Sequence, residues 1–418
     1  MTRVVVIGQG YVGLPLAMRA VEAGYEVVGY DTDAARVKRL IAGESYVEDV
    51  PEPVLAAALE SGRYLPTIEE DDCAGYGVAV ITVPTPLRDG VPDLSFVEAA
   101  GRTLGRHLTE GACVVLESTT YPGTTEELLA PILDEASGLV AGEGYHLGYS
   151  PERIDPGNPV WGLANTPKIV SGVNGASLVA VRSFYDSLVA ETVPVSGTRE
   201  AEMTKLIENT FRHVNIALVN ELAMFAGDLG VDIWEALDAA QTKPFGFMRF
   251  DPGPGVGGHC LPVDPSYLAW RVRRRVGAAF RFVELANEVN DHMPEYVVRR
   301  LARSLNRQGK CVSGSRILLL GLSYKPNTSD LRESPALVVA GLLRELGANV
   351  RAADPHVEPE WVGDAATLTE LTLEEVDAAD AVIVLTNHSR FDLEMVADRA
   401  RLVLDTRRSM PAGTGERL

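Results

Sequence analysis

A glycine-rich turn close to the start of the chain restricts its fold more than any other feature. The turn, Gly8-Gln9-Gly10-Tyr11-Val12-Gly13, follows an apolar run at 4–7 and precedes an amphipathic segment of helical length. A second apolar run at 26–30 is followed by Asp31, at about the 20-residue spacing that lets an acidic side chain meet a ribose. Glycine-rich turns are common in isolation, but this order of strand, turn, helix, strand and carboxylate predicts a Rossmann dinucleotide-binding unit.

Asp31 also predicts which dinucleotide is bound. A carboxylate at this place accepts hydrogen bonds from the ribose hydroxyls and repels the 2′-phosphate of NADP. NAD is therefore the expected cofactor. Arg36 is close enough in the sequence to weaken this discrimination, and it is kept among the cofactor-binding candidates.

The rest of the chain repeats the α/β pattern on both sides of a helical middle. Strand-like runs occur at 78–83, 114–116, 316–321, 349–354, 381–385 and 401–405, and long helical stretches at 199–225 and 278–305. The fold class predicted is α/β, with two Rossmann-like doubly wound domains joined by a central helical domain. We expect these domains at 1–198, 199–306 and 307–418, with a ligand in the cleft between the two α/β domains.

The charge of the chain limits its partners. Among 418 residues, 38 Lys and Arg stand against 58 Asp and Glu, which gives a net charge of −20. The electric field of so negative a protein repels nucleic acid and acidic membrane surfaces, so neither is an expected partner. A small anionic substrate needs local cations, and Lys325 and Arg332 in the loop after the 316–321 run are candidates to hold a diphosphate or carboxylate.

The cysteines indicate neither a disulfide framework nor a metal site. Cys73, Cys113, Cys260 and Cys311 are far apart and form no CxxC pair, and the apolar run around Cys113 predicts a core position. The first residues resemble a strand rather than a signal sequence, and no apolar run reaches membrane-spanning length. A cytoplasmic protein without a bound metal is therefore expected.

One cysteine stands in a setting that suits a covalent nucleophile. Cys260 follows Gly257-Gly258-His259 and precedes Asp264 by four residues. Glycines open a path to a thiolate and leave backbone N–H groups free for negative charge, while the carboxylate can handle a proton or a water. Taken alone, the segment fits a tight turn with a buried cysteine equally well.

Other polar groups offer possible partners for such chemistry. Thr85 and Thr119 follow strand-like runs, where open parallel sheets bind ligands, although Ser/Thr/Pro clusters are also ordinary turns. Lys205 and Asn209 lie four residues apart on the helix predicted from 199, so they face the same way and together suit an oxyanion. Acidic residues near the start of this helix, Glu200 and Glu202, suit a helix N-terminus.

Two longer motifs carry a resemblance to a known family. They are Gly253-Pro254-Gly255-Val256-Gly257-Gly258-His259-Cys260 and Ser150-Pro151-Glu152-Arg153-Ile154-Asp155-Pro156-Gly157-Asn158. With the glycine-rich turn, the helical middle and the second α/β region in this order, the whole chain resembles the UDP-glucose/GDP-mannose dehydrogenase family. Within it, the motifs look most like the branch acting on UDP-N-acetylglucosamine or UDP-N-acetylmannosamine.

The resemblance implies a role for each candidate residue. Cys260 is the implied nucleophile, Asp264 orients water, Lys205 and Asn209 stabilise an oxyanion, and Glu152 and Thr119 take part in proton transfer or water positioning. The cofactor-binding candidates are Gly8, Gly10, Tyr11, Val12, Gly13, Asp31, Arg36, Thr85, Thr119 and Lys325. The candidates for contact with the nucleotide sugar are Glu152, Arg153, Lys205, Asn209, Arg212, Arg249, Phe250, Gly257, Lys325 and Arg332.

The sequence departs from the family pattern at two places. UDP-glucose dehydrogenases carry a second glutamate four residues after the first, where this chain has Pro156, so proton transfer must rest on Glu152, Lys205 and water. The segment 248–251, Met-Arg-Phe-Asp, is also more charged than the family pattern predicts. These charges bear on which sugar the site accepts.

The reaction implied is a four-electron oxidation of a sugar CH2OH to a carboxylate by two NAD, with the C-terminal domain binding the nucleotide sugar. UDP-glucose and dTDP-glucose remain alternative substrates. Two other classes also remain open, a two-electron hydroxyacid dehydrogenase and a non-catalytic NAD-binding regulator. A homodimer is expected, although the apolar positions Ile216, Val219, Leu222 and Phe225 fit core packing as well as an interface.

Overall fold

The computed structural model describes residues 2–88, 90–155, 158, 160–258 and 260–418, and for Cys260 only the backbone. The chain forms two compact units, 1–208 and 209–418. Pro156, His259 and the side chain of Cys260 lie outside the described part.

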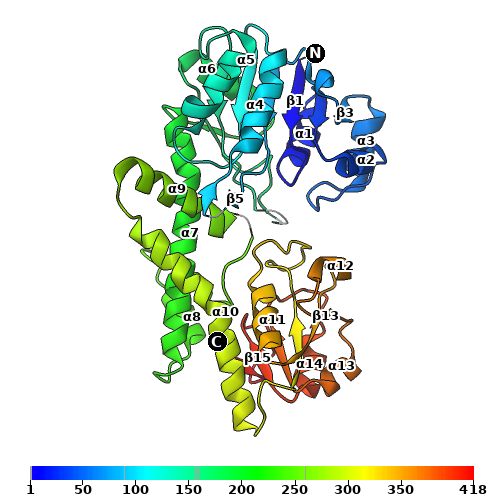
Figure 1. Cartoon of the computed structure of the whole chain (residues 1–418), viewed down its shortest axis with the longest axis vertical. Helices are drawn as coiled ribbons and strands as arrows, with labels where there is room; N and C mark the ends of the chain where they lie inside the picture. The colour runs from blue at the N-terminus through cyan, green and yellow to red at the C-terminus, as the bar shows by residue number, and fades with distance from the viewer. Residues whose placement is uncertain (1, 89, 156–157, 159, 259) are drawn as a thin grey trace. The chain divides into compact units, whose positions relative to one another are not determined.

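A six-stranded parallel sheet forms the centre of the first unit (Figure 1). Its strands, in spatial order, are β3 (Tyr64–Thr67), β2 (Glu26–Tyr30), β1 (Arg3–Ile7), β4 (Val78–Ile81), β7 (Cys113–Leu116) and β8 (His146–Tyr149). The helices are α1 (Gly13–Glu22), α2 (Ala34–Ile41), α3 (Glu52–Glu60), α4 (Ser95–His107), α5 (Ala130–Ser137) and α6 (Gly175–Asp186), with the short helices η1 (Glu70–Cys73) and η2 (Thr125–Leu129). Two small sheets pair β5 (Leu87–Arg88) with β6 (Val91–Pro92) and β9 (Lys168–Val170) with β10 (Thr192–Pro194). The central strands are rich in valine and buried, as expected for a parallel sheet covered by helices, and Cys113 is buried within β7.

Long helices dominate the middle of the chain. They are α7 (Thr198–Ala226), α8 (Ile233–Ala240), α9 (Cys260–Val276) and α10 (Arg281–Arg307). Within the second unit, the later turns of α7 lie beside α10 (Figure 1), and the hydrogen bond from Asn220 Nδ2 to Asn290 Oδ1, 2.9 Å long, joins them. None of the described helices is long and apolar enough to cross a membrane.

The second unit contains a sheet with the same strand order as the first. Its strands are β13 (Thr367–Leu368), β12 (Asn349–Ala353), β11 (Arg316–Leu320), β14 (Ala381–Val384), β15 (Val403–Asp405) and β16 (Glu416–Arg417). Its helices are α11 (Pro335–Glu345), α12 (Pro359–Val362), α13 (Leu373–Ala378) and α14 (Leu393–Arg399). The predicted fold class, two doubly wound α/β regions with a helical region between them in the sequence, is confirmed.

The equivalent carboxylates of the two sheets have different neighbours. Asp31 after β2 accepts a hydrogen bond from Gln9 N, 2.8 Å away, and Asp354 after β12 accepts one from Leu322 N, 2.7 Å away. The fully buried His388 places its Nε2 3.0 Å from Asp354 Oδ2, whereas Asp31 pairs with a half-exposed arginine. The second carboxylate is therefore enclosed by its own unit, which favours the first sheet as the dinucleotide site.

Glu202 does not serve the start of α7 as the sequence suggests. It is fully buried and accepts hydrogen bonds from Gly123 N at 2.5 Å, Thr125 N at 2.9 Å and Thr125 Oγ1 at 2.7 Å. Burial raises the pKa of Glu202 from 4.5 to about 7, although these hydrogen bonds act in the opposite direction. The carboxyl group thus links the 123–125 segment to α7 through these hydrogen bonds.

We expect this carboxyl group to make the stability of the protein depend on pH. Its pKa is higher in the folded than in the unfolded chain, so the stabilisation is complete below about pH 4.5 and is lost as the pH rises through about 7. In urea denaturation, the wild type should lose on the order of 2–3 kcal/mol more than Glu202→Gln between pH 5 and pH 8. Glu200→Gln, which removes an exposed carboxylate of the same helix, should keep the wild-type slope. Parallel pH dependences for wild type and Glu202→Gln would contradict the expectation.

Candidate active site

The glycine-rich turn has the shape of a pyrophosphate-binding loop. Gly8 has a φ of +93°, and a Cβ there would lie 2.8 Å from Thr82 O. A Cβ on Gly13 would overlap the Gly8 carbonyl oxygen, whereas one on Gly10 would meet no heavy atom within 4 Å. In the described structure no side chain caps α1, and the positive end of a helix favours an anion. The loop fits the pyrophosphate of NAD.

Asp31 and Arg36 form one unit at the end of β2. Asp31 Oδ2 lies 2.8 Å from Arg36 Nη1, and Oδ1 accepts a hydrogen bond from Asp33 N at 2.9 Å. Asp33 caps α2 by accepting from Ala35 N and Arg36 N. The positive charge of Arg36 is thus engaged by the carboxylate at the ribose position, which limits its attraction for a 2′-phosphate.

We therefore expect a strong preference for NAD over NADP, at least about 100-fold in kcat/KM, because a phosphate would meet a buried carboxylate. Asp31→Ala should reduce this ratio by about tenfold or more, since it removes the repulsion and releases Arg36. Asp33→Asn is the matched control, because asparagine retains the helix cap. Comparable kcat/KM values for the two cofactors in the wild type would show that Asp31 does not discriminate between NAD and NADP.

Two further cofactor candidates meet at neighbouring strand ends. Thr85 follows β4 and Thr119 follows β7, and these strands pair in the sheet. Thr85 Oγ1 donates a hydrogen bond to Thr119 O at 2.9 Å. The tertiary structure thus joins the two hydroxyl-bearing loops at the ligand-binding edge of the sheet.

Glu152 is a carboxylate of the first unit that follows β8 and pairs with Lys168. Its Oε1 accepts hydrogen bonds from Arg153 N at 2.7 Å and Ile154 N at 2.6 Å. Burial alone would raise the pKa of Glu152, but Lys168, the two backbone N–H groups and Lys205 hold it below its usual value. Glu152 is therefore suited to accept a proton.

Two neighbouring candidates differ in their surroundings. Lys205 on α7 is buried, with 6% of its surface exposed, and acts electrostatically on Glu152. The Arg153 guanidinium instead pairs with Glu208, with Nη2 2.6 Å from Oε1, and donates to Pro167 O. Within this unit, Arg153 is therefore a structural partner of α7.

Two charged residues beside Glu152 had no role in the sequence prediction. Glu117 and Lys168 are buried and form an ion pair. A lysine at the start of the short, buried strand β9 was the available signal for this pair. Its partner, Glu117, directly follows β7 and lies two residues before Thr119, in a segment that the sequence analysis considered only for its hydroxyl groups.

A second polar group is assembled in the second unit. The buried Asn209 donates from Nδ2 to Asp264 Oδ2 at 2.5 Å, and Arg212 Nη2 donates to Asn209 Oδ1 at 2.6 Å. Asp264 is four residues after Cys260, where α9 begins, and so lies one helical turn further along. Helix N-termini favour thiolates. The arrangement offers a carboxylate and an oriented amide close in sequence to a cysteine.

The paired glycines pack closely against the loop after β11. A Cβ on Gly257 would lie 2.6 Å from the Tyr324 Cβ, and one on Gly258, whose φ is +80°, would lie 2.7 Å from the Tyr324 ring. Gly258 N donates to Arg332 O at 2.9 Å. The glycines thus serve the packing of two loops in addition to the open path expected from the sequence.

The predicted substrate cations are partly neutralised by neighbouring carboxylates. Arg332 Nη2 lies 2.5 Å from Asp330 Oδ2, and Arg249 lies 2.6 Å from Asp238 and 2.7 Å from Asp251. The Phe250 ring packs edge-on against Phe211. The charged residues at 249 and 251 therefore pair with each other, while Lys325 is half-buried in the loop that packs on the glycines.

A partly buried arginine of the second unit was also missed from the sequence. Arg407 follows β15 and donates from Nε to Leu385 O at 2.8 Å. Burial lowers the pKa of Arg407 to about 10. Its guanidinium would be 2.6 Å from a Cβ on Gly253, so the proline- and glycine-rich turn passes directly over a cation.

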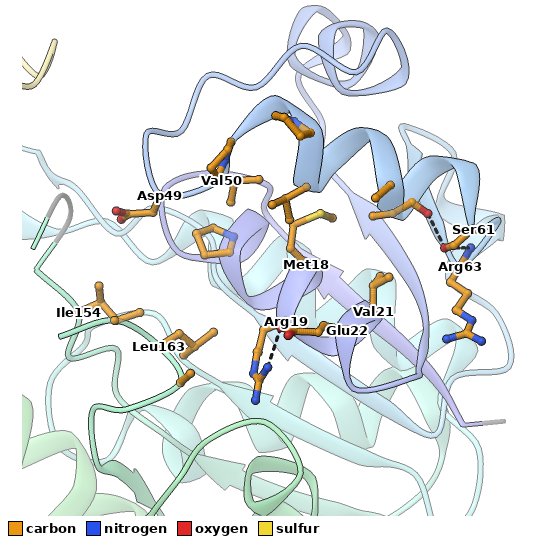
Figure 2. Close-up of a pocket in the computed structure, with 18 of the residues that line it drawn as sticks. Met18, Arg19, Val21, Glu22, Asp49, Val50, Ser61, Arg63, Ile154 and Leu163 are labelled. Carbon is orange, nitrogen blue, oxygen red and sulfur yellow. Dashed lines mark hydrogen bonds and ion pairs between the residues drawn. The ribbon is translucent and has the colours of Figure 1, made fainter. Parts of the chain in front are cut away.

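A large apolar pocket lies elsewhere in the first unit. It has a volume of about 790 Å³ and is lined by α1 residues such as Met18 and Val21, by residues 49–63, and by Ile154 and Leu163 (Figure 2). Among its described lining residues there is none of the predicted site residues. Nor do the described residues contain a cluster of three or more His, Cys, Asp or Glu side chains able to hold a metal ion. We therefore place the chemistry at the polar groups rather than in the pocket.

Comparison with known proteins agrees with this geometry. Three models of the UDP-glucose/GDP-mannose dehydrogenase family match the chain, the NAD binding domain at 2–189, the central domain at 199–292 and the UDP binding domain at 318–412. The UDP-N-acetyl-D-mannosamine dehydrogenase of Pyrococcus horikoshii is 37% identical over 391 residues, which are 93% of this chain and 90% of that protein. The UDP-N-acetyl-D-glucosamine 6-dehydrogenase of Pseudomonas aeruginosa is 37% identical over 393 residues, which are 93% and 91% of the two chains.

A solved structure is similar over the same length. The UDP-D-ManNAc dehydrogenase from Pyrococcus horikoshii superposes with a TM-score of 0.90 at 34% identity, covering 100% of this chain and 99% of that one. Together with the glycine-rich loop and the Asn209–Asp264 pair, these similarities confirm the resemblance seen in the sequence. The chain therefore belongs to the UDP-glucose/GDP-mannose dehydrogenase family and is an NAD-dependent nucleotide-sugar dehydrogenase.

Proposed function

We propose that this enzyme oxidises the C6 hydroxymethyl group of a UDP-N-acetylhexosamine to a carboxylate. The observation that carries the proposal is the 37% identity, along 93% of the chain, to dehydrogenases named for UDP-N-acetylmannosamine and UDP-N-acetylglucosamine.

A four-electron oxidation explains why a dehydrogenase needs a cysteine. Each of two NAD molecules accepts one hydride, and the balance for one alcohol is two NADH, one carboxylate and three protons, with one water consumed. An aldehyde lacks the tetrahedral carbon from which a second hydride can leave. Attack by Cys260 supplies that carbon as a thiohemiacetal, and its oxidation leaves a thioester that water hydrolyses.

Each surrounding residue is assigned to a charge or a proton that appears during these reaction steps. Lys205 and Asn209 stabilise the oxyanion, Asp264 orients the water, and Glu152 with Thr119 manages the protons. The lowered pKa of Glu152 keeps its carboxylate ionised, which a proton acceptor requires. Lys325, Arg332 and Arg212 are proposed to contact the nucleotide sugar.

The test is NADH release per substrate over a panel of UDP-N-acetylglucosamine, UDP-N-acetylmannosamine, UDP-glucose and dTDP-glucose. We expect two NADH per molecule of a UDP-N-acetylhexosamine, with the uronic acid identified by mass spectrometry. One NADH would indicate a two-electron dehydrogenase. Turnover only with UDP- or dTDP-glucose would show that the sugar of the substrate is glucose and not an N-acetylhexosamine. Binding without turnover would indicate a regulator.

We further propose that two copies of the chain associate through α7. Phe211, Leu218, Leu222 and Phe225 are between 45% and 55% exposed, and their spacings of seven, four and three residues place them on one face of the helix. Val219 is instead buried, so the apolar positions divide between core and surface. Sedimentation equilibrium should give twice the chain mass, and Leu222→Glu should shift it toward the monomer.

We also propose a cytoplasmic location. The described thiols of Cys73, Cys113 and Cys311 are all free, which suits a reducing compartment. Alkylation of the native and the unfolded protein isolated from cells would count these thiols.

A further inference from the structure

A buried charge cluster lies directly behind Glu152. Lys168 on β9 is 3% exposed and Glu117 at the end of β7 is 1% exposed. Lys168 Nζ pairs with Glu117 Oε1, donates to Pro151 O at 3.1 Å, and lies 3.4 Å from Glu152 Oε2. Tyr185 on α6 donates to Glu117 Oε1 at 3.0 Å, and its ring lies 5.3 Å from Lys168 Nζ. One ammonium group thus stands between two carboxylates.

The two carboxylates differ in their access to the surface. The side chain of Glu152 is 13% exposed, whereas that of Glu117 is completely buried. Glu117 Oε2 has no hydrogen-bond partner among the described residues. Glu117 is therefore closed to a substrate, and its described contacts are to Lys168 and Tyr185.

We propose that Lys168 is a positioning residue for Glu152: anchored by Glu117 and Tyr185, it holds the Glu152 carboxylate ionised and fixed in place. The inference rests on the proposed role of Glu152 as the proton acceptor. It also explains how one carboxylate suffices where Pro156 replaces a second glutamate.

The electrostatics of the cluster agree with this geometry. Burial raises the pKa of Glu117 and would lower that of Lys168, but the two carboxylates raise the pKa of Lys168 instead. The charged groups that face Glu152 are Lys168 from β9, Lys205 from α7 and Glu117 from the end of β7, with Tyr185 contributing from α6. Arg153 is engaged with Glu208. Among these groups, Lys168 is the cation whose contact with the Glu152 side chain is an ion pair.

The arrangement predicts different effects for two substitutions. Lys168→Met removes the cation and leaves Glu152 beside a second carboxylate, so the acidic limb of the kcat profile should move up by about 1–2 pH units. Glu117→Gln retains Lys168 and removes the like charge, so the same limb should move down or stay. Lys168→Arg keeps a cation at this place and should restore most of the wild-type profile.

A second measurement follows Glu152 without turnover. In protein labelled with 13C at the glutamate carboxyl carbon, the Glu152 signal is identified by its loss in Glu152→Gln. Wild-type Glu152 should stay ionised down to pH 5, whereas in Lys168→Met it should titrate within about pH 5–7. If Lys168→Met does not fold, the double variant Lys168→Met/Glu117→Gln avoids the uncompensated buried carboxylate, and the Glu152 signal should still shift upward relative to Glu117→Gln.

A purely structural role for Lys168 would lower the melting temperature and leave both titrations unchanged, and that result would overturn the proposal. Failure of the proposed function gives a different result. The wild type would then not release two NADH per sugar, while the carboxyl titration would still report whether Lys168 controls Glu152.

Discussion

Replacing Cys260 with serine is expected to lower the rate of acid formation by at least about 10³-fold, while NAD binding stays near the wild-type value. The thiolate is required once an aldehyde exists, and a serine hydroxyl is a far weaker nucleophile at neutral pH. The glycine-rich loop that fits the pyrophosphate belongs to the other unit of the chain. NADH release followed by fluorescence, uronic acid measured by mass spectrometry and NAD titration by calorimetry together check the expectation.

Cys311→Ser is the matched control, because Cys311 is an exposed free thiol in the segment before β11. It should leave acid formation unchanged. Steady production of uronic acid by Cys260→Ser would show that no covalent cysteine intermediate is needed.

Lys205→Met is expected to reduce kcat by about 10²–10³-fold with a much smaller change in substrate KM. A preorganised donor at a developing oxyanion contributes in the transition state rather than in the ground state. Lys205 suits this role because it is buried, with 6% of its surface exposed, and its charge also acts on Glu152. Steady-state rates at saturating NAD, and single-turnover rates at high enzyme concentration, measure the effect.

Lys38→Met provides the control, since Lys38 is an exposed lysine on α2. Its kcat should equal that of the wild type. A loss confined to KM in Lys205→Met would identify Lys205 as a ground-state substrate contact.

The sequence predicted the fold and NAD as the cofactor because both depend on local patterns. Predicted strands at 4–7, 26–30 and 316–321 correspond to β1, β2 and β11, and the helix predicted at 199–225 is α7. Runs of apolar, β-branched residues alternate with helical periodicity, and this alternation needs no knowledge of distant contacts. The spacing from Gly8 to Asp31 is likewise set by one strand, one helix and one turn.

Pairs far apart in the chain were decided by the tertiary structure. Glu202 was expected to serve the start of its own helix, but it bonds to Gly123 and Thr125, which the fold brings against α7. Gly257 and Gly258 were expected to open a path to the cysteine, and they also lie against Tyr324. Neither contact leaves a periodic trace in the sequence, because each partner is more than sixty residues away.

The sequence by itself determined the fold class, NAD as the cofactor and the residue types available for catalysis. The tertiary structure decided which charges meet. Glu117, Glu152 and Lys168 come from three segments that converge at the edge of the first unit's sheet, and their burial makes each charge depend on the others. The low dielectric of a protein interior strengthens such interactions, so the charge state of Glu152 is a property of the folded protein rather than of any local sequence.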